Sequence, residues 1–588
     1  MSGQTKKPFH DQPGLGDHIL RHVAESGVAL RIGPSSITDA GSGLFAVNDI
    51  PAGSDIFRSQ PFLLVCESAI DGICDWCLLN RNSSVHPDGR FYTSLDKRPD
   101  ISPCSRCRVA QYCSKDCQAK AWKAYHKYEC AMLKESPDVA SLEQALCRLL
   151  LWLKKNVLSK DDFRFLTALE THFETRMDRN REQSNGDFDI DQALAVATNA
   201  QIATKSTLDL SIIQRLYHAV LTNAFTIRPP ELEQAYGICL DLVVSLINHC
   251  CDENAHVFFE GRELRCRALK DIPAGSEITV CYQDTRQDVL HRRRALKEQF
   301  DIICNCAKCK AEMQEHLEAD VKHDDYIETL RDAQGKLDKL QYNYATAFEN
   351  YTARNIRAVL EYQNKLLDIE KEVYHGGNWP SHMEPMPTAL RTLGCMFRDL
   401  GCVVGLEFIL KGTLYTRHHS GPSWVLDLMC VVKYMILIAQ SNDDDDLKWT
   451  GAGHPDVLGG RATLRDVARG YMTIVCVDGK FTFGLDAKYV QALYKMAGDI
   501  LERRGDPDIG TDEFSLRFEK AQERLMAWAK MKPSRGLELP SRQVIMGLKK
   551  DSEAPKAGCV GGGQKGGPSP PVSALALQSR SLEQELPS

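Results

Sequence analysis

Eight cysteine and histidine residues stand in four ordered pairs between residues 74 and 130. They are Cys74, Cys77, Cys104, Cys107, Cys113, Cys117, His126 and Cys130. Thiolates and imidazoles are the ligands that structural zinc prefers, and two ligands two or three residues apart can reach one ion from a single turn of chain. Eight ligands fill two tetrahedral sites and leave no coordination position open. The pattern therefore predicts two zinc ions that stabilise the fold, with sequential or interleaved pairing equally compatible with the spacing.

A second group, Cys304-x-Cys306-x2-Cys309, offers three further thiols. Three ligands do not complete a tetrahedral zinc site, so a fourth ligand must come from elsewhere in the chain. The same short run also fits ordinary surface thiols, and its spacing alone does not decide between the two.

Three short stretches outside these clusters carry residues that could bind or orient a ligand. The loop Gly41-Ser42-Gly43 lets backbone approach a ligand closely because glycine has no Cβ, although no dinucleotide-binding strand and helix surround it. Asn248-His249 is by itself more often a cap or a turn. Tyr282 ends a strand-like stretch, where a tyrosine is usually half-buried with its hydroxyl in water. Each of these features is weak alone and takes its weight from its neighbours.

The first cysteine block resembles the MYND zinc finger. Tyr112 directly precedes Cys113, and Trp122 and His126 follow at the spacing of that family. The resemblance implies interleaved sites. It assigns one ion to Cys74, Cys77, Cys113 and Cys117, and the other to Cys104, Cys107, His126 and Cys130.

Four separated stretches together resemble the SET domain of the SET-and-MYND protein lysine methyltransferases, over roughly residues 28 to 312. They are Gly41 to Ala46, Asn223 to Ile227, Ser245 to Asn254 and Gly275 to Tyr282. The resemblance implies S-adenosyl-L-methionine as the cofactor, Tyr282 as the catalytic residue and Cys251 as the fourth ligand of a third, post-SET zinc. The cofactor-binding residues that it implies are Gly41, Ser42, Gly43, Asn223, Ser245, Asn248, His249, Tyr282 and Phe300.

The chain departs from the family pattern at several of these positions. Cys250 stands where the family has serine, and Glu253 stands where it has proline. The aromatic pair that precedes the CxCxxC run in the family becomes Phe300, which keeps a ring without a hydroxyl, and Ile302, which has no ring. These departures bear on cofactor affinity, on the shape of the substrate channel and on the number of methyl groups added.

The resemblance implies direct transfer of a methyl group from a sulfonium to a neutral lysine amine of a histone or non-histone protein. Such a transfer depends on alignment and desolvation more than on a covalent catalyst. Tyr282 would orient the reacting groups and polarise them. Because the reference pKa of a lysine is near 10.4, deprotonation of the substrate is the expected pH-sensitive step.

Two other classes of function compete with the enzyme. A catalytically weak adaptor would use the finger to bind peptides, often proline-rich in this family, and a helical C-terminal region as a second surface. Sequence-specific DNA binding by the finger is the poorer alternative, although basic residues that could contact phosphate are present. These residues are Arg106, Arg108, Lys115, Lys120, Lys123 and Lys127.

The composition places these motifs in a large folded protein. A chain of 588 residues exceeds the roughly 250 to 300 residues of a single core, and 43% hydrophobic with 26% charged residues is typical of globular proteins. The formal charge of -7 gives no general attraction for nucleic acid. The N-terminus lacks the apolar core of a signal peptide, and no run of about 18 uninterrupted apolar residues occurs. We therefore expect a monomeric protein of the nucleus or cytoplasm, with a protein substrate and no membrane partner.

Sequence periodicity and an internal repeat predict the secondary-structure elements that position these motifs. The phrase DIPAGSDI at 49–56 recurs as DIPAGSEI at 271–278. Two similar strand corners on either side of long insertions predict one β domain interrupted in sequence, and 257–268 reads as a β-hairpin. The segment 291–294 is expected to be a solvated helical face, and 443–446 a solvated acidic loop.

The expected architecture is an α+β, multi-domain protein with a β-rich split SET domain. Its parts are an N-terminal extension (1–27), the first SET part (28–73), the MYND zinc finger (74–130), a helical insert (131–235), the SET core (236–285), a post-SET zinc clip (286–312), a C-terminal TPR-like helical-hairpin domain (320–531) and a disordered tail (532–588).

Overall fold

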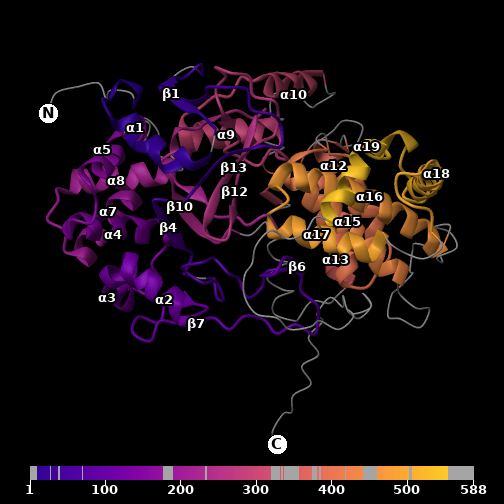
Figure 1. The fold of residues 1–588 in the computed structure, drawn as a ribbon, viewed down its shortest axis with the longest axis horizontal. Helices are drawn as coiled ribbons and strands as arrows, with labels where there is room; N and C mark the ends of the chain where they lie inside the picture. The colour runs from indigo at the N-terminus through magenta and orange to yellow at the C-terminus, as the bar shows by residue number, and fades with distance from the viewer. Residues whose placement is uncertain are drawn as a thin grey trace, which may run out of the picture.

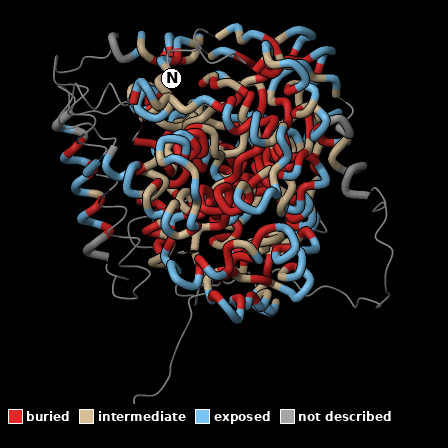
Figure 2. The backbone as a smooth tube through the Cα atoms, turned by 90° about the vertical axis from the view of Figure 1, so that its left-hand side faces the viewer, coloured by how far each residue is buried: buried red, intermediate tan, exposed pale blue. Residues whose placement is uncertain are grey.

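The computed structural model places most of the chain in two lobes that lie side by side (Figure 1). It describes residues 9–26, 28–37, 40–68, 70–176, 190–231, 235–318, 356–373, 386–416, 419–440, 460–501 and 506–553, with a few single positions between them. One lobe holds the sheets and the earlier helices, and the other holds the later helices. Buried segments gather in the interior of the molecule (Figure 2).

Short sheets in the first lobe join strands from both sides of the insertions. β3 (Asp55–Ser59) pairs with β13 (Glu263–Ala268), which forms the expected hairpin with β12 (Ala255–Glu260). β10 (Gly237–Leu240) lies between β4 (Leu63–Cys66) and β9 (Phe225–Thr226). The strands β1 (Leu30–Pro34) and β2 (Ser42–Ala46) pair with each other, and so do β11 (Asn248–His249) and β14 (Thr279–Val280). The interrupted β domain is therefore present.

The repeated DIPAGS phrase forms a reciprocal contact between its two copies. The amide of Ile50 donates to the carbonyl of Ile272, and the amide of Ile272 donates back, both at 2.9 Å. Asp49 accepts from the amide of Ala274 at 2.7 Å, and Asp271 accepts from the amide of Ala52 at 2.8 Å. Each carboxylate thus caps the turn of the other copy, which joins segments more than 200 residues apart.

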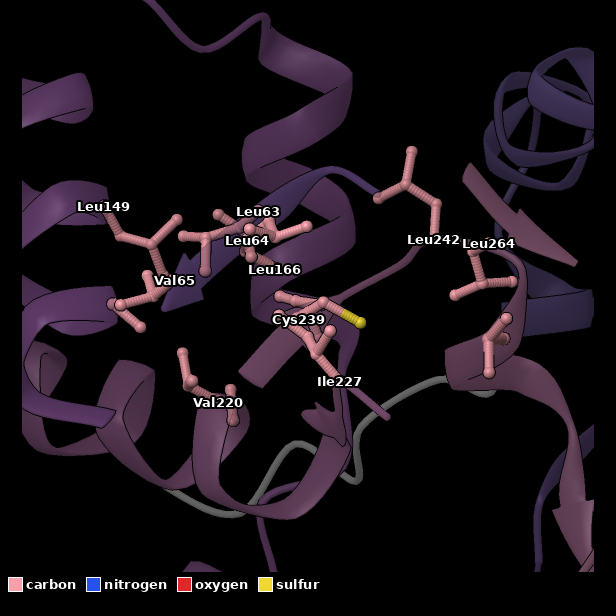
Figure 3. Close-up of a cluster of buried hydrophobic side chains, with 14 of the residues drawn as sticks. Leu63, Leu64, Val65, Leu149, Leu166, Val220, Ile227, Cys239, Leu242 and Leu264 are labelled. Carbon is pink, nitrogen blue, oxygen red and sulfur yellow. The ribbon is translucent and has the colours of Figure 1, made fainter. Parts of the chain in front are cut away.

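Helices of the insert pack on one of these sheets. They are α3 (Lys127–Glu135), α4 (Ser141–Lys154), α5 (Lys160–Ala168), α7 (Ile190–Thr204) and α8 (Leu210–Asn223). Leu64 and Val65 of β4 lie near Leu149 of α4 and Val220 of α8 in one apolar cluster (Figure 3). The insert ends at Asn223 and not near 235 as predicted, because Phe225 and Thr226 already pair with β10.

The cysteine block forms a small unit with two hairpins and short helical turns. β5 (Val85–His86) pairs with β6 (Arg90–Phe91), and β7 (Ser102–Pro103) pairs with β8 (Gln111–Tyr112). Helix α2 (Lys115–Ala121) follows, capped by the Ser114 hydroxyl, and continues through a π turn at Trp122–His126. Ahead of the SET strands, η1 (Phe9–Asp11), α1 (Leu15–Leu20) and η2 (Arg21–Ser26) pack on the first lobe through buried Leu15 and Ile19.

The second lobe consists of helices, as predicted. They are α12 (Ile356–Val373), α13 (Met386–Asp399), α14 (Gly405–Leu414), α15 (Gly421–Gln440), α16 (Gly460–Phe483), α17 (Lys488–Leu501) and α18 (Asp512–Trp528). α13 and α14 approach so closely that a Cβ on Gly394 would lie 2.7 Å from the carbonyl oxygen of Gly405. By length and composition α15 could cross a membrane, but 67% of its most apolar window is buried inside the lobe, which is typical of a core helix.

Two sequence predictions need correction. The tail is not disordered from residue 532, because η6 (Pro533–Arg535) and α19 (Arg542–Glu553) pack on the helical lobe through Leu537 and Ile545, which are 9% and 4% exposed. The basic run at 291–294 is not wholly solvated either, because Arg292 is buried and pairs with Glu312 at 2.6 Å. The predicted acidic loop at 443–446 lies outside the described residues.

The two lobes meet along β3, β13 and the end of α16. Phe258 and Phe483 contact edge to face with ring centroids 5.3 Å apart. Asp486, just after α16, pairs with Arg58 at 2.9 Å and with Arg265 at 3.0 Å. The helical lobe is thereby fixed beside the sheet of β3, β13 and β12.

Candidate active site and metal centres

Tyr282 lies directly after β14 and is held at both ends. Its hydroxyl donates to the carbonyl of Ile247 at 2.7 Å, and its backbone amide donates to Nδ1 of His249 at 3.0 Å. The ring packs against Phe300, with centroids 4.8 Å apart. Burial, with a further contribution from the Glu277 carboxylate, raises the pKa of Tyr282 above its usual range. The phenol is therefore neutral at physiological pH and can donate a hydrogen bond.

Tyr282 opens onto a cleft of about 650 Å³ between the two lobes. Its walls come from the end of α8, from β12, from residues 280–287 and 299–300, and from α15 and α16 of the helical lobe. Among the predicted cofactor-binding residues, Asn223, Ser245, Tyr282 and Phe300 line this cleft. A cavity of this volume can enclose a small molecule together with one extended side chain.

The remaining predicted residues lie behind the cleft wall. Gly41, Ser42, Gly43, Asn248 and His249 are absent from its described lining. Asn248 Nδ2 donates to Glu277 at 2.7 Å and to the carbonyl of Ser42 at 2.9 Å, so it ties the glycine loop to β14. Gly41 has a φ of 69°, and a Cβ on Gly43 would overlap the carboxylate of Glu277. Gly43 is thus needed for the close approach to Glu277, and Gly41 for the left-handed backbone conformation of the loop.

Glu277 is a residue that the sequence argument missed. It is 8% exposed and accepts from the Ser35 hydroxyl at 2.7 Å, from the Ser36 hydroxyl at 2.6 Å and from the Ser36 amide at 2.8 Å. These bonds satisfy a buried charge, which would otherwise be costly. The signal in the sequence was an acid between Gly275 and Tyr282, in a segment whose other residues read as a strand.

One wall of the cleft, formed by His256, Phe258 and Phe483, is aromatic and uncharged. His256 on β12 stacks on Phe258, with centroids 5.8 Å apart and planes 11° apart, and contacts Phe483 edge to face. Burial lowers the pKa of His256 to about 4, so the imidazole is neutral at physiological pH. Phe483 was not predicted to belong to the site because it stands about 200 residues from the SET motifs.

The structure brings the cysteine clusters together in three groups of four, each with its ligand atoms within 4.8 Å of one another. The groups are Cys74, Cys77, Cys113 and Cys117; Cys104, Cys107, His126 and Cys130; and Cys251, Cys304, Cys306 and Cys309. The first two interleave along the chain. Cys77 and Cys113 sulfurs lie 3.6 Å apart, close to the roughly 3.8 Å expected between two sulfurs bound to one tetrahedral zinc. The donor set and its spacing therefore fit zinc.

His249 lies between the third cysteine group and Tyr282. Because its Nδ1 accepts the amide proton of Tyr282, the neutral ring carries its own proton on Nε2, which lies 3.2 Å from the sulfur of Cys251. His249, Cys251 and Cys281 also bring ligand atoms within 4.8 Å of one another. A protonated Nε2 cannot bind a metal ion, so the geometry makes His249 a hydrogen-bond donor to the sulfur of Cys251.

Comparisons with known proteins agree with this arrangement. A family model described as the SET domain matches residues 41–283. "Histone-lysine N-methyltransferase SMYD3" of Mus musculus is 30% identical over 292 residues, which cover 48% of this chain and 62% of that protein. "Histone-lysine N-methyltransferase ASHR1" of Arabidopsis thaliana is 29% identical, over 47% of this chain and 55% of its own. "SET domain and MYND-type zinc finger protein 6" of Schizosaccharomyces pombe is 26% identical, over 47% and 51%.

Residues 41–283 match the SET domain, and the described structure has mixed helical and strand content with C-terminal helices. The chain's resemblance to the SET and MYND methyltransferases is confirmed. The chain spans about half to three fifths of the length of these relatives.

Proposed function

We propose that the chain is an S-adenosyl-L-methionine-dependent protein-lysine N-methyltransferase with Tyr282 as its catalytic tyrosine. The observation that carries the proposal is the Tyr282 hydroxyl, held by the Ile247 carbonyl at the wall of a 650 Å³ cleft. Around it lie residues from stretches that resemble the SET domain at four separate places in the sequence. Proteins that it resembles are named for histone-lysine methylation, so histone lysines are the first substrates to test.

The cofactor, when bound, supplies a methyl group on a positively charged sulfur. Asn223, Ser245 and Phe300 line the cleft and would hold it, and the Gly41-Ser42-Gly43 loop with Asn248 and His249 would fix the shape of the wall behind them. Tyr282 would orient the acceptor amine through its hydroxyl. Phe258, Phe483 and the neutral His256 would exclude water from the substrate lysine. Desolvation favours the neutral amine, which alone has the lone pair that attacks the methyl carbon.

We also propose that the three cysteine groups hold one zinc ion each. All four ligands of each group are protein side chains, so the ions would stabilise the fold and take no part in the transfer. In the second group, Nδ1 of His126 faces the Glu129 carboxylate at 3.8 Å, and Glu129 pairs with Arg148 at 2.7 Å. Such outer partners orient a ligand ring and link the finger to α4 of the insert.

Methyl transfer from labelled S-adenosyl-L-methionine to a mixed histone and cell-protein extract tests the enzyme. Wild type should transfer label, and Tyr282→Phe should lose most of it. Tyr434→Phe is a matched control, because the Tyr434 hydroxyl also donates to a backbone carbonyl but lies in the helical lobe. A zinc-loaded wild type that neither transfers label nor binds the cofactor would overturn the proposal in favour of an adaptor.

A second role in peptide binding is favoured by one feature of the finger. Trp122 is 41% exposed on the finger surface beside His126. Exposed aromatic rings of this kind bind proline-rich segments. We propose that Trp122 contacts such a peptide. Trp122→Ala should abolish binding of a proline-rich peptide by the monomeric chain and leave methyl transfer to free histones unchanged.

A further inference from the structure

A second cavity of about 230 Å³ adjoins the cleft on the side of the finger. Phe259, Pro229 and Pro230 line both spaces, so the cavity continues the cleft away from Tyr282. Its other walls come from the finger, from Tyr236 just before β10, from the end of β12 and from α17 of the helical lobe. A segment of substrate that places its lysine in the cleft would extend a neighbouring side chain into this space.

The cavity holds a carboxylate, Glu231, that forms no direct ion pair among the described residues, although Lys488 lines the same cavity and its charge acts on Glu231. Glu231 accepts from the Ser83 hydroxyl at 2.8 Å, and among the described residues no lysine, arginine or histidine forms an ion pair with it. Burial raises the pKa of Glu231. The neighbouring Glu260 forms an ion pair with Lys488. The Lys488 amide donates to its carboxylate at 3.2 Å, and the Lys488 ammonium lies 3.9 Å from it. The two carboxylates of the cavity, Glu231 and Glu260, therefore share one lysine, Lys488.

A buried hydroxyl points to the same conclusion independently. Tyr236 lines the cavity, is 1% exposed, and its hydroxyl has no hydrogen-bond partner among the described residues. The Asn80 side chain is close enough to lower the pKa of the phenol against the effect of burial, but it lies outside hydrogen-bonding geometry. Buried polar groups are nearly always satisfied in native proteins, so an unpaired hydroxyl beside a cavity marks a place for a polar ligand group.

The remaining walls suit the stem of a long side chain. Phe259 and Tyr489 are buried, and with Pro229 and Pro230 they give apolar surfaces beside the two polar groups. Arginine joins an apolar stem to a planar head with five donors, so it can reach a carboxylate and a phenol oxygen together. Lysine offers the same charge with fewer fixed directions.

We propose that Glu231 and Tyr236 form a subsite for a cationic side chain, preferably arginine, of the protein substrate, at a fixed distance in sequence from the methylated lysine. This assignment rests on the proposed methyltransferase function. Glu231 sets specificity through charge, and Tyr236 positions the head. The substrate class is therefore a basic segment with arginine near the target lysine, and not an isolated lysine in a neutral segment.

The test is a set of single-lysine peptides that carry arginine or its neutral isostere citrulline at each position around the lysine. With wild type, one position should show a KM about tenfold lower for arginine than for citrulline and an unchanged kcat, as expected for a charge-assisted hydrogen bond. With Glu231→Gln that ratio should fall to about one, and with Tyr236→Phe it should fall in part. Glu143→Gln is the matched control, because Glu143 is a half-buried carboxylate on α4 outside these cavities.

A binding measurement separates this inference from the proposed function. Saturation-transfer NMR with acetyl-arginine amide and acetyl-citrulline amide reads the subsite on the full zinc-loaded chain without any turnover. A stronger signal for arginine with wild type that is lost in Glu231→Gln supports the subsite even where no methyl transfer occurs. An equal response to both probes, or an arginine preference that survives Glu231→Gln, overturns the subsite even where the enzyme is active.

Discussion

Replacing Gly43 by alanine should disrupt the wall behind the cleft. The added Cβ would overlap the carboxylate of Glu277 and come within 3.1 Å of Asn248 Nδ2. Neither neighbour can move freely, because Glu277 is fixed by three bonds from Ser35 and Ser36, and Asn248 also donates to the carbonyl of Ser42. The alanine must therefore strain the loop or break the bond between Asn248 and Glu277.

The expected cost is the sum of two effects. Overpacking by one methyl group costs about 1 to 3 kcal/mol, and loss of a hydrogen bond to a buried charge costs about 1.5 to 3 kcal/mol. Partial relaxation makes a total of about 3 kcal/mol reasonable, which corresponds to a fall of roughly 6 °C in the unfolding temperature of a lobe of this size. Affinity for S-adenosyl-L-methionine should fall as well, because the loop shapes the proposed cofactor site.

Differential scanning calorimetry and isothermal titration with the cofactor would measure both effects. Gly498→Ala on α17 is the control, because a Cβ there meets nothing within 4 Å and the change should be neutral or slightly stabilising. The reasoning is refuted by a Gly43→Ala protein with wild-type stability and cofactor affinity. It is also refuted by an equal loss in Gly498→Ala.

Three further predictions concern the metal groups, the insert and the tail. Elemental analysis should find three zinc ions per chain, and two in Cys309→Ser, whereas Cys476→Ser, which replaces a buried thiol outside the clusters, should keep three. Burial, with help from Arg176, lowers the pKa of His218 from 6.5 to about 4, so the unfolded chain binds more protons and stability should fall as pH drops from about 6.5 towards 4. At pH 5 the buried neutral His218 should have lowered the free energy of unfolding by about 2 kcal/mol relative to neutral pH. Urea titrations should therefore show a shallower pH dependence of stability for His218→Gln than for wild type, and an unchanged slope would contradict this prediction. Ile545→Ala should lower the stability of the helical lobe by about 2 to 4 kcal/mol in urea unfolding. An unfolding midpoint equal to that of wild type would contradict the packing of this segment on the lobe.

The sequence predicted those features of the molecule that depend on residues close together in the chain. The hairpin of β12 and β13 and the paired DIPAGS corners depend on turn residues that act within a few positions. The short-spaced ligand pairs and the CxCxxC run were also found, because short spacing fixes which thiols share a turn of chain. Cys251, the fourth member of the third group, came from the family resemblance. The interleaving of the first two groups depended on the family resemblance, since spacing alone allowed either order.

Long-range packing was not predictable in the same way. Phe483 enters the cleft from a helix about 200 residues beyond the SET motifs, and no periodic pattern relates the two. Glu277 stands in a strand-like stretch, where an acid normally faces water, and only the fold shows the four donors that satisfy it. In the tail, scattered polar residues masked the few apolar side chains that pack, such as Ile545.

The third cysteine group and the proposed catalytic tyrosine form one structural unit. Cys251 stands two residues after His249, so β11 delivers a metal ligand and its hydrogen-bond donor together. His249 accepts the amide proton of Tyr282 with its other nitrogen, and this bond fixes the end of β14 from which the hydroxyl reaches Ile247. A thiolate bound to zinc stays deprotonated and can accept from Nε2, which keeps the ring in the tautomer that receives the Tyr282 amide. The metal would therefore act on catalysis without touching the substrate, by holding the backbone of Tyr282 in place.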